Sequence, residues 1–189
     1  KLPIGCDVPE TIILADGDFP SHPLALEWLR QCPYVVCCDG AANTYIRSGR
    51  MPEAIVGDGD SLLPGIKERY ASLIHSETEQ ETNDLSKAFR FCLSQERKRI
   101  TIMGATGKRE DHTIGNVSLL ADYMEQAEVR MMTDYGIFVP IREDSMFESY
   151  IGQQISVFNM NSTALSAEGL AYPLSVFTNW WQGTLNEAL

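Results

Sequence analysis

Short apolar runs rich in β-branched residues alternate with amphipathic helical patterns over the first two thirds of this 189-residue chain. The apolar runs, which predict strands, are residues 11–14, 34–38, 54–56, 100–103 and 129–133. The helical patterns lie between them, at residues 23–31, 41–48, 65–73, 85–97 and 113–126. Strands that alternate with helices over short connections form a mostly parallel sheet, and helices cover both of its faces. The sequence therefore predicts an α/β fold for this part of the chain.

The pattern changes after about Asp134. Short segments without a helical period follow, separated by Gly, Asn and Ser: residues 136–141, 154–158, 164–166 and one segment near Val176. Such segments are typical of an antiparallel β unit. We therefore expect a larger α/β domain at residues 1–134 and a smaller all-β domain at residues 135–189.

The charge and the cysteines limit the classes of partner and location. The formal net charge is −11 at pH 7, so a nucleic-acid partner is not expected, because nucleic acids are bound mainly through Lys and Arg. A membrane is not expected either, since no apolar run approaches the roughly 18 residues of a membrane span. The cysteines show no C-x-x-C spacing and are expected to be buried thiols in a reducing cytoplasm. An acidic protein needs divalent cations to accept a polyphosphate, whereas it attracts a cationic small molecule directly.

Polar residues gather in four clusters, and three of them begin within a residue of the end of a predicted strand. The clusters are residues 39–43, 57–61, 82–87 and 104–112. In an open α/β sheet the carboxyl ends of the strands line the ligand crevice. We therefore expect clusters that are distant in sequence to meet on one rim of the sheet.

Asp58 and Asp60 are spaced i, i+2, which directs both carboxylates to one side of an extended segment. Gly57 and Gly59 permit a tight backbone there and leave space for a ligand. Asp84, at a predicted helix start, is the natural third ligand. Carboxylates that converge without His or Cys favour a hard cation, Mg²⁺ or Mn²⁺. The alternatives are that the Asp-Gly pairs only form turns and that Asp84 only caps its helix.

Residues 104–112 combine glycines with Lys108 and Arg109 ahead of a predicted helix. A glycine-rich backbone, cationic side chains and a helix N-terminus favour phosphate binding. The segment is not a P-loop, because its glycines are too closely spaced and no Ser or Thr follows Lys108. His112 next to Asp111 is either part of a catalytic pair or, as we favour, a capping and packing residue.

The clusters read D-G-A-A-N at 39–43, G-D-x-D-S at 57–61, D-L-x-K-A at 84–88 and G-A-x-G-x-R-x-D-H at 104–112. In this order and spacing they resemble the bacterial thiamine pyrophosphokinase family. Segments at residues 152–156, 169–174 and 183–187 continue the resemblance, which covers nearly the whole chain.

The resemblance implies an ATP-binding α/β domain followed by a β-sandwich that binds thiamine and mediates dimerisation. It implies a homodimer whose active sites lie between the α/β domain of one subunit and the β domain of the other. The implied activity is the Mg²⁺-dependent transfer of pyrophosphate from ATP to the thiamine hydroxyl, which gives thiamine pyrophosphate and AMP. Mn²⁺ is a possible substitute for Mg²⁺, and ATP is the co-substrate.

The resemblance also assigns roles to individual residues. The catalytic set is Asp58, Asp60, Asp84, Arg109 and Asp111, of which the first three bind the metal. The positions on the ATP side are Asp39, Gly40, Ser61, Lys87, Gly104, Gly107, Arg109, His112 and Asn116. The positions on the thiamine side are Gln80, Tyr172, Thr184 and Asn186, with Tyr172 stacking on a ring of the vitamin.

Several residues depart from the family pattern. Gly59 stands where Phe is frequent, Asn83 where Thr is usual, Lys108 where Gly is usual and Leu185 where Ser is common. The first three leave the carboxylates in place, whereas Leu185 changes the polar lining expected for thiamine. Relatives run on beyond the position of Leu189, so the resemblance implies a further C-terminal segment.

Two other functions fit parts of the sequence. Residues 58–61 resemble the D-x-D motif of aspartyl-nucleophile phosphatases. However, Leu62 stands where that motif has Thr or Val, the motif follows the third strand instead of the first, and no later acidic pair supplies a second metal site. A non-catalytic nucleotide or thiamine sensor would use the same pocket, and the retained carboxylates and Arg109 argue against it.

Overall fold

A computed structural model describes residues 7–79, 81–160, 162–174, 183 and 185–189. The chain divides into two compact units, of which the larger is Asp7–Asp144 and the smaller includes Ser145–Leu189. Within the described ranges, no helix has both the length and the hydropathy that a membrane crossing requires.

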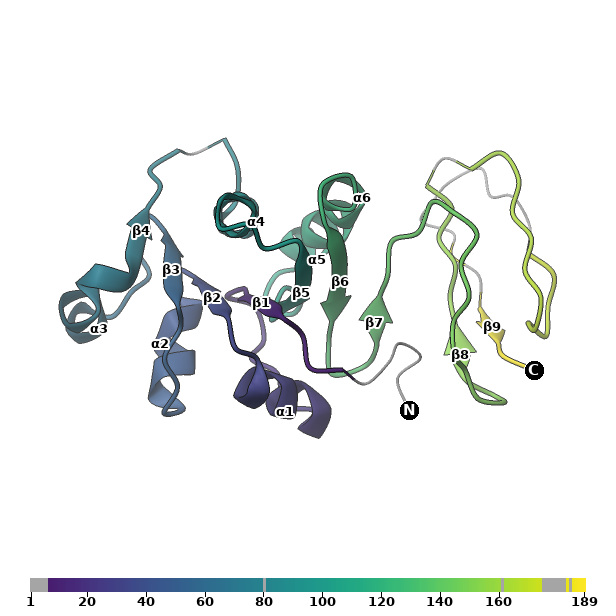
Figure 1. Cartoon of the computed structure of the whole chain (residues 1–189), viewed down its shortest axis with the longest axis horizontal. Helices are drawn as coiled ribbons and strands as arrows, with labels where there is room; N and C mark the ends of the chain where they lie inside the picture. Colours follow the sequence, from purple (N-terminus) through teal and green to yellow (C-terminus); the bar gives the residue numbers. More distant parts are fainter. Residues whose placement is uncertain (1–6, 80, 161, 175–182, 184) are drawn as a thin grey trace. The chain divides into compact units, whose positions relative to one another are not determined.

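In the described residues, the larger unit is built on a seven-stranded sheet (Figure 1). Its strands are β1 Thr11–Leu14, β2 Val35–Cys38, β3 Ala54–Gly57, β4 Ile74–Ser76, β5 Arg99–Met103, β6 Glu128–Met132 and β7 Ile137–Phe138. Their order in the sheet is β4-β3-β2-β1-β5-β6-β7, and neighbouring strands are parallel except β6 and β7. Strands β1, β2 and β3 are buried along their whole length, as their unbroken apolar sequences predict.

Helices cover both faces of this sheet, so the predicted α/β fold class is confirmed. They are α1 Pro23–Gln31, α2 Ala41–Arg47, α3 Pro64–Arg69, the 3₁₀ helix η1 Ala71–Leu73, α4 Asp84–Ser94, α5 Glu110–Ser118 and α6 Leu120–Tyr123. Figure 1 shows α1 and α2 on one face and α4 and α6 on the other. Phe89 of α4 and Tyr123 of α6 belong to one core cluster with strand residues, and their rings stack at 3.9 Å. On the opposite face α1 buries Trp28 and α2 buries Tyr45.

Several elements differ from the sequence-based expectation, and the helix expected at 65–73 is divided into α3 and η1. Strand β4 was missed because it lies at the edge of the sheet, is not fully buried and carries no apolar run. The helix expected at 113–126 begins earlier, at Glu110, and is interrupted at Leu119. The earlier start makes Arg109 the N-cap residue of α5, so the glycine-rich cluster leads directly into a helix N-terminus.

Within the expected β segment 136–141, Ile137–Phe138 forms strand β7, which belongs to the large sheet. The chain reverses after β6 through a hydrogen bond from Thr133 N to Gly136 O (2.9 Å), and β7 then pairs antiparallel with β6. A tight turn makes the preceding strand the nearest pairing partner. The larger unit therefore extends to Asp144, beyond the boundary expected after Asp134. The division of roles between two domains stays a prediction.

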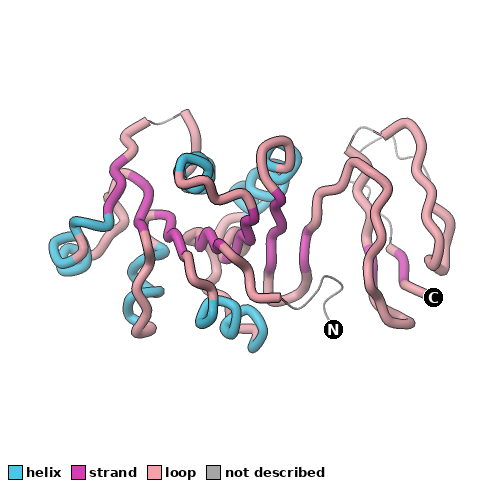
Figure 2. Tube along the Cα trace, in the orientation of Figure 1, coloured by secondary structure: helices cyan, strands magenta, loops and turns pink. Residues whose placement is uncertain are grey.

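The smaller unit contains a two-stranded antiparallel sheet in its described residues. Strand β8 Gln154–Ile155 pairs with β9 Asn186–Glu187, and Leu170 forms an antiparallel bridge with Ala188. Figure 2 shows that most of its described backbone is loop. Residues 164–166 form no strand, and the strand expected near Val176 lies outside the described residues. The antiparallel β character expected for this part of the chain is confirmed.

Candidate functional site

Three of the four polar clusters, at residues 57–61, 82–87 and 104–112, contribute to one cleft at the carboxyl edge of the large sheet. This cleft of about 420 Å³ lies between the loops that follow β1, β3 and β5 and the first turn of α4. The predicted site residues that line it are Asp58, Asp60, Asp84, Lys87, Gly107, Arg109, His112 and Asn116. The expectation that residues distant in sequence meet on one rim is confirmed.

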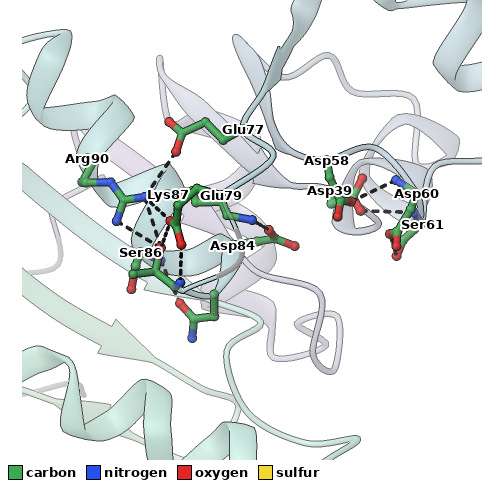
Figure 3. Close-up of polar contacts among 12 residues, drawn as sticks. Asp39, Asp58, Asp60, Ser61, Glu77, Glu79, Asp84, Ser86, Lys87 and Arg90 are labelled. Carbon is green, nitrogen blue, oxygen red and sulfur yellow. Dashed lines mark hydrogen bonds and ion pairs between the residues drawn. The ribbon is translucent and has the colours of Figure 1, made fainter.

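Asp39, Asp58 and Asp60 form what we term the acidic cluster. One oxygen from each of the three carboxylates lies within 4.8 Å of the others (Figure 3). Asp39 follows β2 in a left-handed conformation (φ 34°), and its N–H donates to Val56 O at 2.9 Å. This backbone contact places the Asp39 carboxylate beside the loop that follows β3.

The loop after β3 holds the acidic cluster together. A Cβ at Gly57 would lie 2.8 Å from the Asp39 Cβ, so glycine is needed for this close approach. Ser61 N donates to Asp39 Oδ2 at 3.1 Å, and the Ser61 hydroxyl donates to Asp60 Oδ1 at 2.9 Å. Asp60 N donates to Asp58 Oδ1 at 3.1 Å. These hydrogen bonds offset part of the repulsion among the three carboxylates.

Asp39 carries a buried oxygen that lacks a partner. The residue is 3% exposed, and its Oδ1 has no hydrogen-bond partner among the described residues. Burial raises the pKa of Asp39 to about 6, the Ser61 N–H opposes the rise, and Asp60, Asp84 and Asp58 add to it. A buried carboxylate oxygen without a partner is costly unless a proton or a cation satisfies it. Because the cluster offers only oxygen ligands, it fits Mg²⁺ or Mn²⁺ better than zinc.

Asp84 lines the cleft but lies outside the acidic cluster. Its carboxylate accepts a hydrogen bond from the Lys87 ammonium at 3.1 Å, and the Lys87 side chain is 4% exposed (Figure 3). The cap of α4 is Asn83, whose Oδ1 accepts from Ser86 N at 2.9 Å, so the alternative that Asp84 only caps this helix is wrong. The role of Asp84 as a metal ligand stays a prediction, while Asp39 is the third member of the observed cluster.

The loop between β5 and α5 places cations beside the cleft. Gly104 (φ 65°) and Gly107 (φ 77°) are both left-handed, and a Cβ at Gly104 would lie 2.6 Å from Ala15 O. Arg109 lines the cleft and pairs with Asp111 at 2.5 Å. The hydrogen bond from Arg109 lowers the pKa of Asp111. Asp111 is not among the described residues that line the cleft, and its catalytic role stays a prediction.

Asn116 ties two sides of the cleft together. Its buried amide accepts from Asn83 Nδ2 at 3.0 Å and donates to Ala105 O at 2.8 Å. The start of α4 is therefore connected through α5 to the loop after β5. The assignment of Asn116 as a direct ATP contact stays a prediction.

The cleft residues that follow β1 were not predicted from the sequence. Asp16 and Gly17 both line the cleft. A Cβ at Gly40 would lie 2.5 Å from Asp16 Oδ2, so Gly40 serves to bring the ends of β1 and β2 together. A signal was present, because Asp16-Gly17-Asp18 repeats the D-G-D spacing of residues 58–60 shortly after a predicted strand.

Two of the residues expected to bind thiamine are described in the smaller unit. Asn186 is buried, and its side-chain amide accepts from Tyr172 N at 3.0 Å and donates to Tyr172 O at 2.8 Å. Asn186 thus fixes the backbone of Tyr172, which is itself 62% exposed. Gln80 and Thr184 lie outside the described residues.

Two family models match the chain. The model described as "Thiamin pyrophosphokinase, catalytic domain" matches residues 25–133, and "Thiamin pyrophosphokinase, substrate-binding domain" matches residues 136–189. Thiamine pyrophosphokinase 1 of Oryza sativa subsp. japonica is 30% identical over 129 residues, which cover 55% of this chain and 49% of the relative. Thiamine pyrophosphokinase of Bacillus subtilis strain 168 is 33% identical over 86 residues, which cover 43% of this chain and 40% of the relative. The chain spans about half the length of the curated relatives it matches, or less.

Solved structures share the fold. Thiamin pyrophosphokinase from Candida albicans superposes with a TM-score of 0.72 at 19% identity, covering 99% of this chain and 85% of that one. The enzyme from Geobacillus thermodenitrificans gives a TM-score of 0.64 at 20% identity, covering 94% and 87%. At these identities the likeness concerns the fold.

Proposed function

Because the chain belongs to the thiamin pyrophosphokinase family, we propose that it transfers a pyrophosphoryl group from ATP to the hydroxyl of thiamine, giving thiamine pyrophosphate and AMP. The observation that carries this proposal is the acidic cluster with its buried, unpaired Asp39 oxygen. It adjoins a cleft that is also lined by Lys87 and Arg109. Carboxylates and cations in one cleft suit a substrate that is a metal-bound polyphosphate.

We propose Mg²⁺, with Mn²⁺ as a substitute, as the metal of this site. Asp39, Asp58 and Asp60 would hold the ion. Asp84, which the family resemblance assigns as a metal ligand together with Asp58 and Asp60, would join them. When bound, the ion supplies the positive charge that lets an acidic site accept a polyphosphate.

The reaction demands positioning and charge stabilisation more than covalent catalysis. The thiamine hydroxyl oxygen attacks the β-phosphorus of ATP in line, the bond from that phosphorus to the oxygen bridging the α-phosphate breaks, and AMP leaves. Arg109 stabilises charge on the transferred group, and Lys87 and His112 contact the ATP side. A carboxylate of the acidic cluster accepts the hydroxyl proton, because Asp111 is engaged by Arg109.

The thiamine side of the proposal rests on charge and on Tyr172. The thiazolium of thiamine is a cation, which an acidic protein attracts. An exposed tyrosine ring held at its backbone by Asn186 is suited to stack on a cationic ring.

The proposed reaction is tested by mixing the protein with ATP, Mg²⁺ and thiamine and quantifying the products by chromatography. AMP and thiamine pyrophosphate in equal amounts support the proposal, and omission of thiamine or Mg²⁺ should abolish both. Release of inorganic phosphate supports the phosphatase alternative, and binding without products supports the sensor alternative.

We also propose that the chain acts as a homodimer in the cytoplasm. The dimer, with sites shared between the α/β domain of one subunit and the β domain of the other, follows from the family resemblance. The cytoplasmic location is supported by the free thiols of Cys37, Cys38 and Cys92, which are buried as expected for a reducing compartment.

A further inference from the structure

An ion pair joins two loops beside the cleft. Lys108 Nζ donates to Asp16 Oδ1 and to Asp16 O, both at 3.0 Å. Both residues line the cleft, together with Asp58, Asp60 and Arg109. Neither belongs to the acidic cluster. Lys108 lies in the segment whose sequence favours phosphate binding, but the proposed reaction assigns no contact to Lys108 or to Asp16.

Packing does not account for Lys108. Its side chain is 54% exposed, so it buries little apolar area. Its backbone is left-handed (φ 57°), a conformation that glycine adopts without cost and other residues do not. Residues that keep such a conformation against its cost concentrate at ligand sites.

Holding the two loops together does not account for Lys108 either. Backbone hydrogen bonds already join these loops, from Gly17 N to Gly104 O (2.6 Å) and from Asp18 N to Thr106 O (2.8 Å). A half-exposed ion pair adds little stability to loops that backbone hydrogen bonds already join. The Lys108 ammonium has three N–H donors and Asp16 accepts two hydrogen bonds from it, which leaves one donor for a ligand.

We propose that Lys108 binds the polyphosphate of the nucleotide and that Asp16 positions its ammonium. This inference rests on the proposed function, which brings a triphosphate into the cleft. The carboxylates of Asp58, Asp60 and Asp84 line the same cleft and repel an anion. An ammonium fixed among them offsets that repulsion and donates a charge-assisted hydrogen bond to a phosphate oxygen.

The first experiment measures the Kd of the Mg²⁺ complex of α,β-methylene-ATP by calorimetry. Lys108→Met keeps the stem and the backbone conformation and should weaken binding about tenfold, the low end for a hydrogen bond between charged groups. Lys108→Gly removes the cost of the left-handed backbone at this position, so the Tm should stay the same or rise. It should weaken binding of the analogue as much as Lys108→Met does. The control is Lys98→Met, which removes the same charge from the exposed residue just before β5, at the opposite edge of the sheet.

The second experiment separates a direct contact from an effect through Asp16. Lys108→Met is introduced into an Asp16→Asn background, in which the amide oxygen still accepts a hydrogen bond from the ammonium. A direct contact predicts that Lys108→Met weakens binding there too. Loss of its effect in that background would show that Lys108 acts only on Asp16 and would overturn the inference.

The outcomes also separate the inference from the proposed function. AMP formation by the unmutated protein, with a Kd that is insensitive to Lys108, overturns the inference and leaves the function intact. A Lys108-dependent Kd without AMP formation supports the inference and contradicts the function. Failure of the unmutated protein to bind the analogue overturns both.

Discussion

Asp39 combines a left-handed backbone, burial and an unpaired oxygen, and these properties shape the pH response of the metal-free protein. Burial raises its pKa from 3.8 to about 6 in the folded chain. Between these values the folded state binds more protons than the unfolded state, so the free energy of unfolding falls as the pH rises through this window. The loss from this one group is roughly 3 kcal/mol once it is ionised.

We therefore expect Asp39→Asn to stabilise the metal-free protein at pH 7.5 by several degrees in Tm and to change it little at pH 4.5. The amide carries no charge, so the cost of ionising a buried group disappears. Thermal unfolding in EDTA at the two pH values measures this difference. Added Mg²⁺ should raise the Tm of the unmutated protein at pH 7.5 and have little effect on the variant. Equal destabilisation of the variant at both pH values would contradict this account.

At the scale of elements, the start of α4 sets one side of the cleft. Asn83 caps this helix through Oδ1 and reaches α5 by donating from Nδ2 to Asn116 Oδ1. A serine keeps the cap but loses the bridge, so Asn83→Ser should cost about 1 kcal/mol. Asn83→Ala loses both and should cost about 1 kcal/mol more. Urea unfolding compares the two variants, and equal stability would show that the cap contributes nothing.

The strands were predictable where burial on both faces leaves an unbroken apolar run, as in β1, β2 and β3. Edge strand β4 has no such run. The break between α5 and α6 at Leu119 does not change the spacing of the apolar residues from which a single helix was predicted at 113–126. Strand β7 forms a hairpin with β6 through the turn at Thr133–Gly136. Its pairing with the large sheet was not predicted, because the sequence pattern changes from α/β to short β segments at this turn.

The site was predictable as far as topology decides it. The rule that strand ends share a rim correctly brought the loop of Asp58 and Asp60 to the same cleft as the loop after β5, and the predicted helix start placed Asp84 there too. The grouping of Asp39 with the first two was not predicted, because it depends on a left-handed residue and on the missing side chain of Gly57. Side-chain direction at such a turn does not follow from spacing in the sequence.

At the scale of the whole molecule, the proposal assigns residues of both units to the reaction. Asp58→Asn should leave less than about a tenth of the activity, since it removes a metal ligand. Tyr172→Ala should mainly raise the KM for thiamine. If each active site is shared between subunits, an equal mixture of the two variants, assayed at low thiamine, should recover about a quarter of the unmutated activity.

The matched control for this mixture pairs Asp58→Asn with a chain that carries both substitutions. No combination of these subunits forms an intact site, so activity should not recover. Subunit exchange in the mixture of single variants is verified first. If this mixture is then no more active than the control, the result contradicts shared sites and places each site within one chain.

The central claim is that the acidic cluster holds a divalent cation against the polyphosphate. Crystals grown with Mn²⁺, α,β-methylene-ATP and thiamine test it most directly through anomalous diffraction at the manganese edge. We predict an anomalous peak within about 2.3 Å of carboxylate oxygens of Asp58 and Asp60, with a phosphate oxygen also bound to the ion. A bound nucleotide whose Mn²⁺ contacts neither carboxylate would contradict the account.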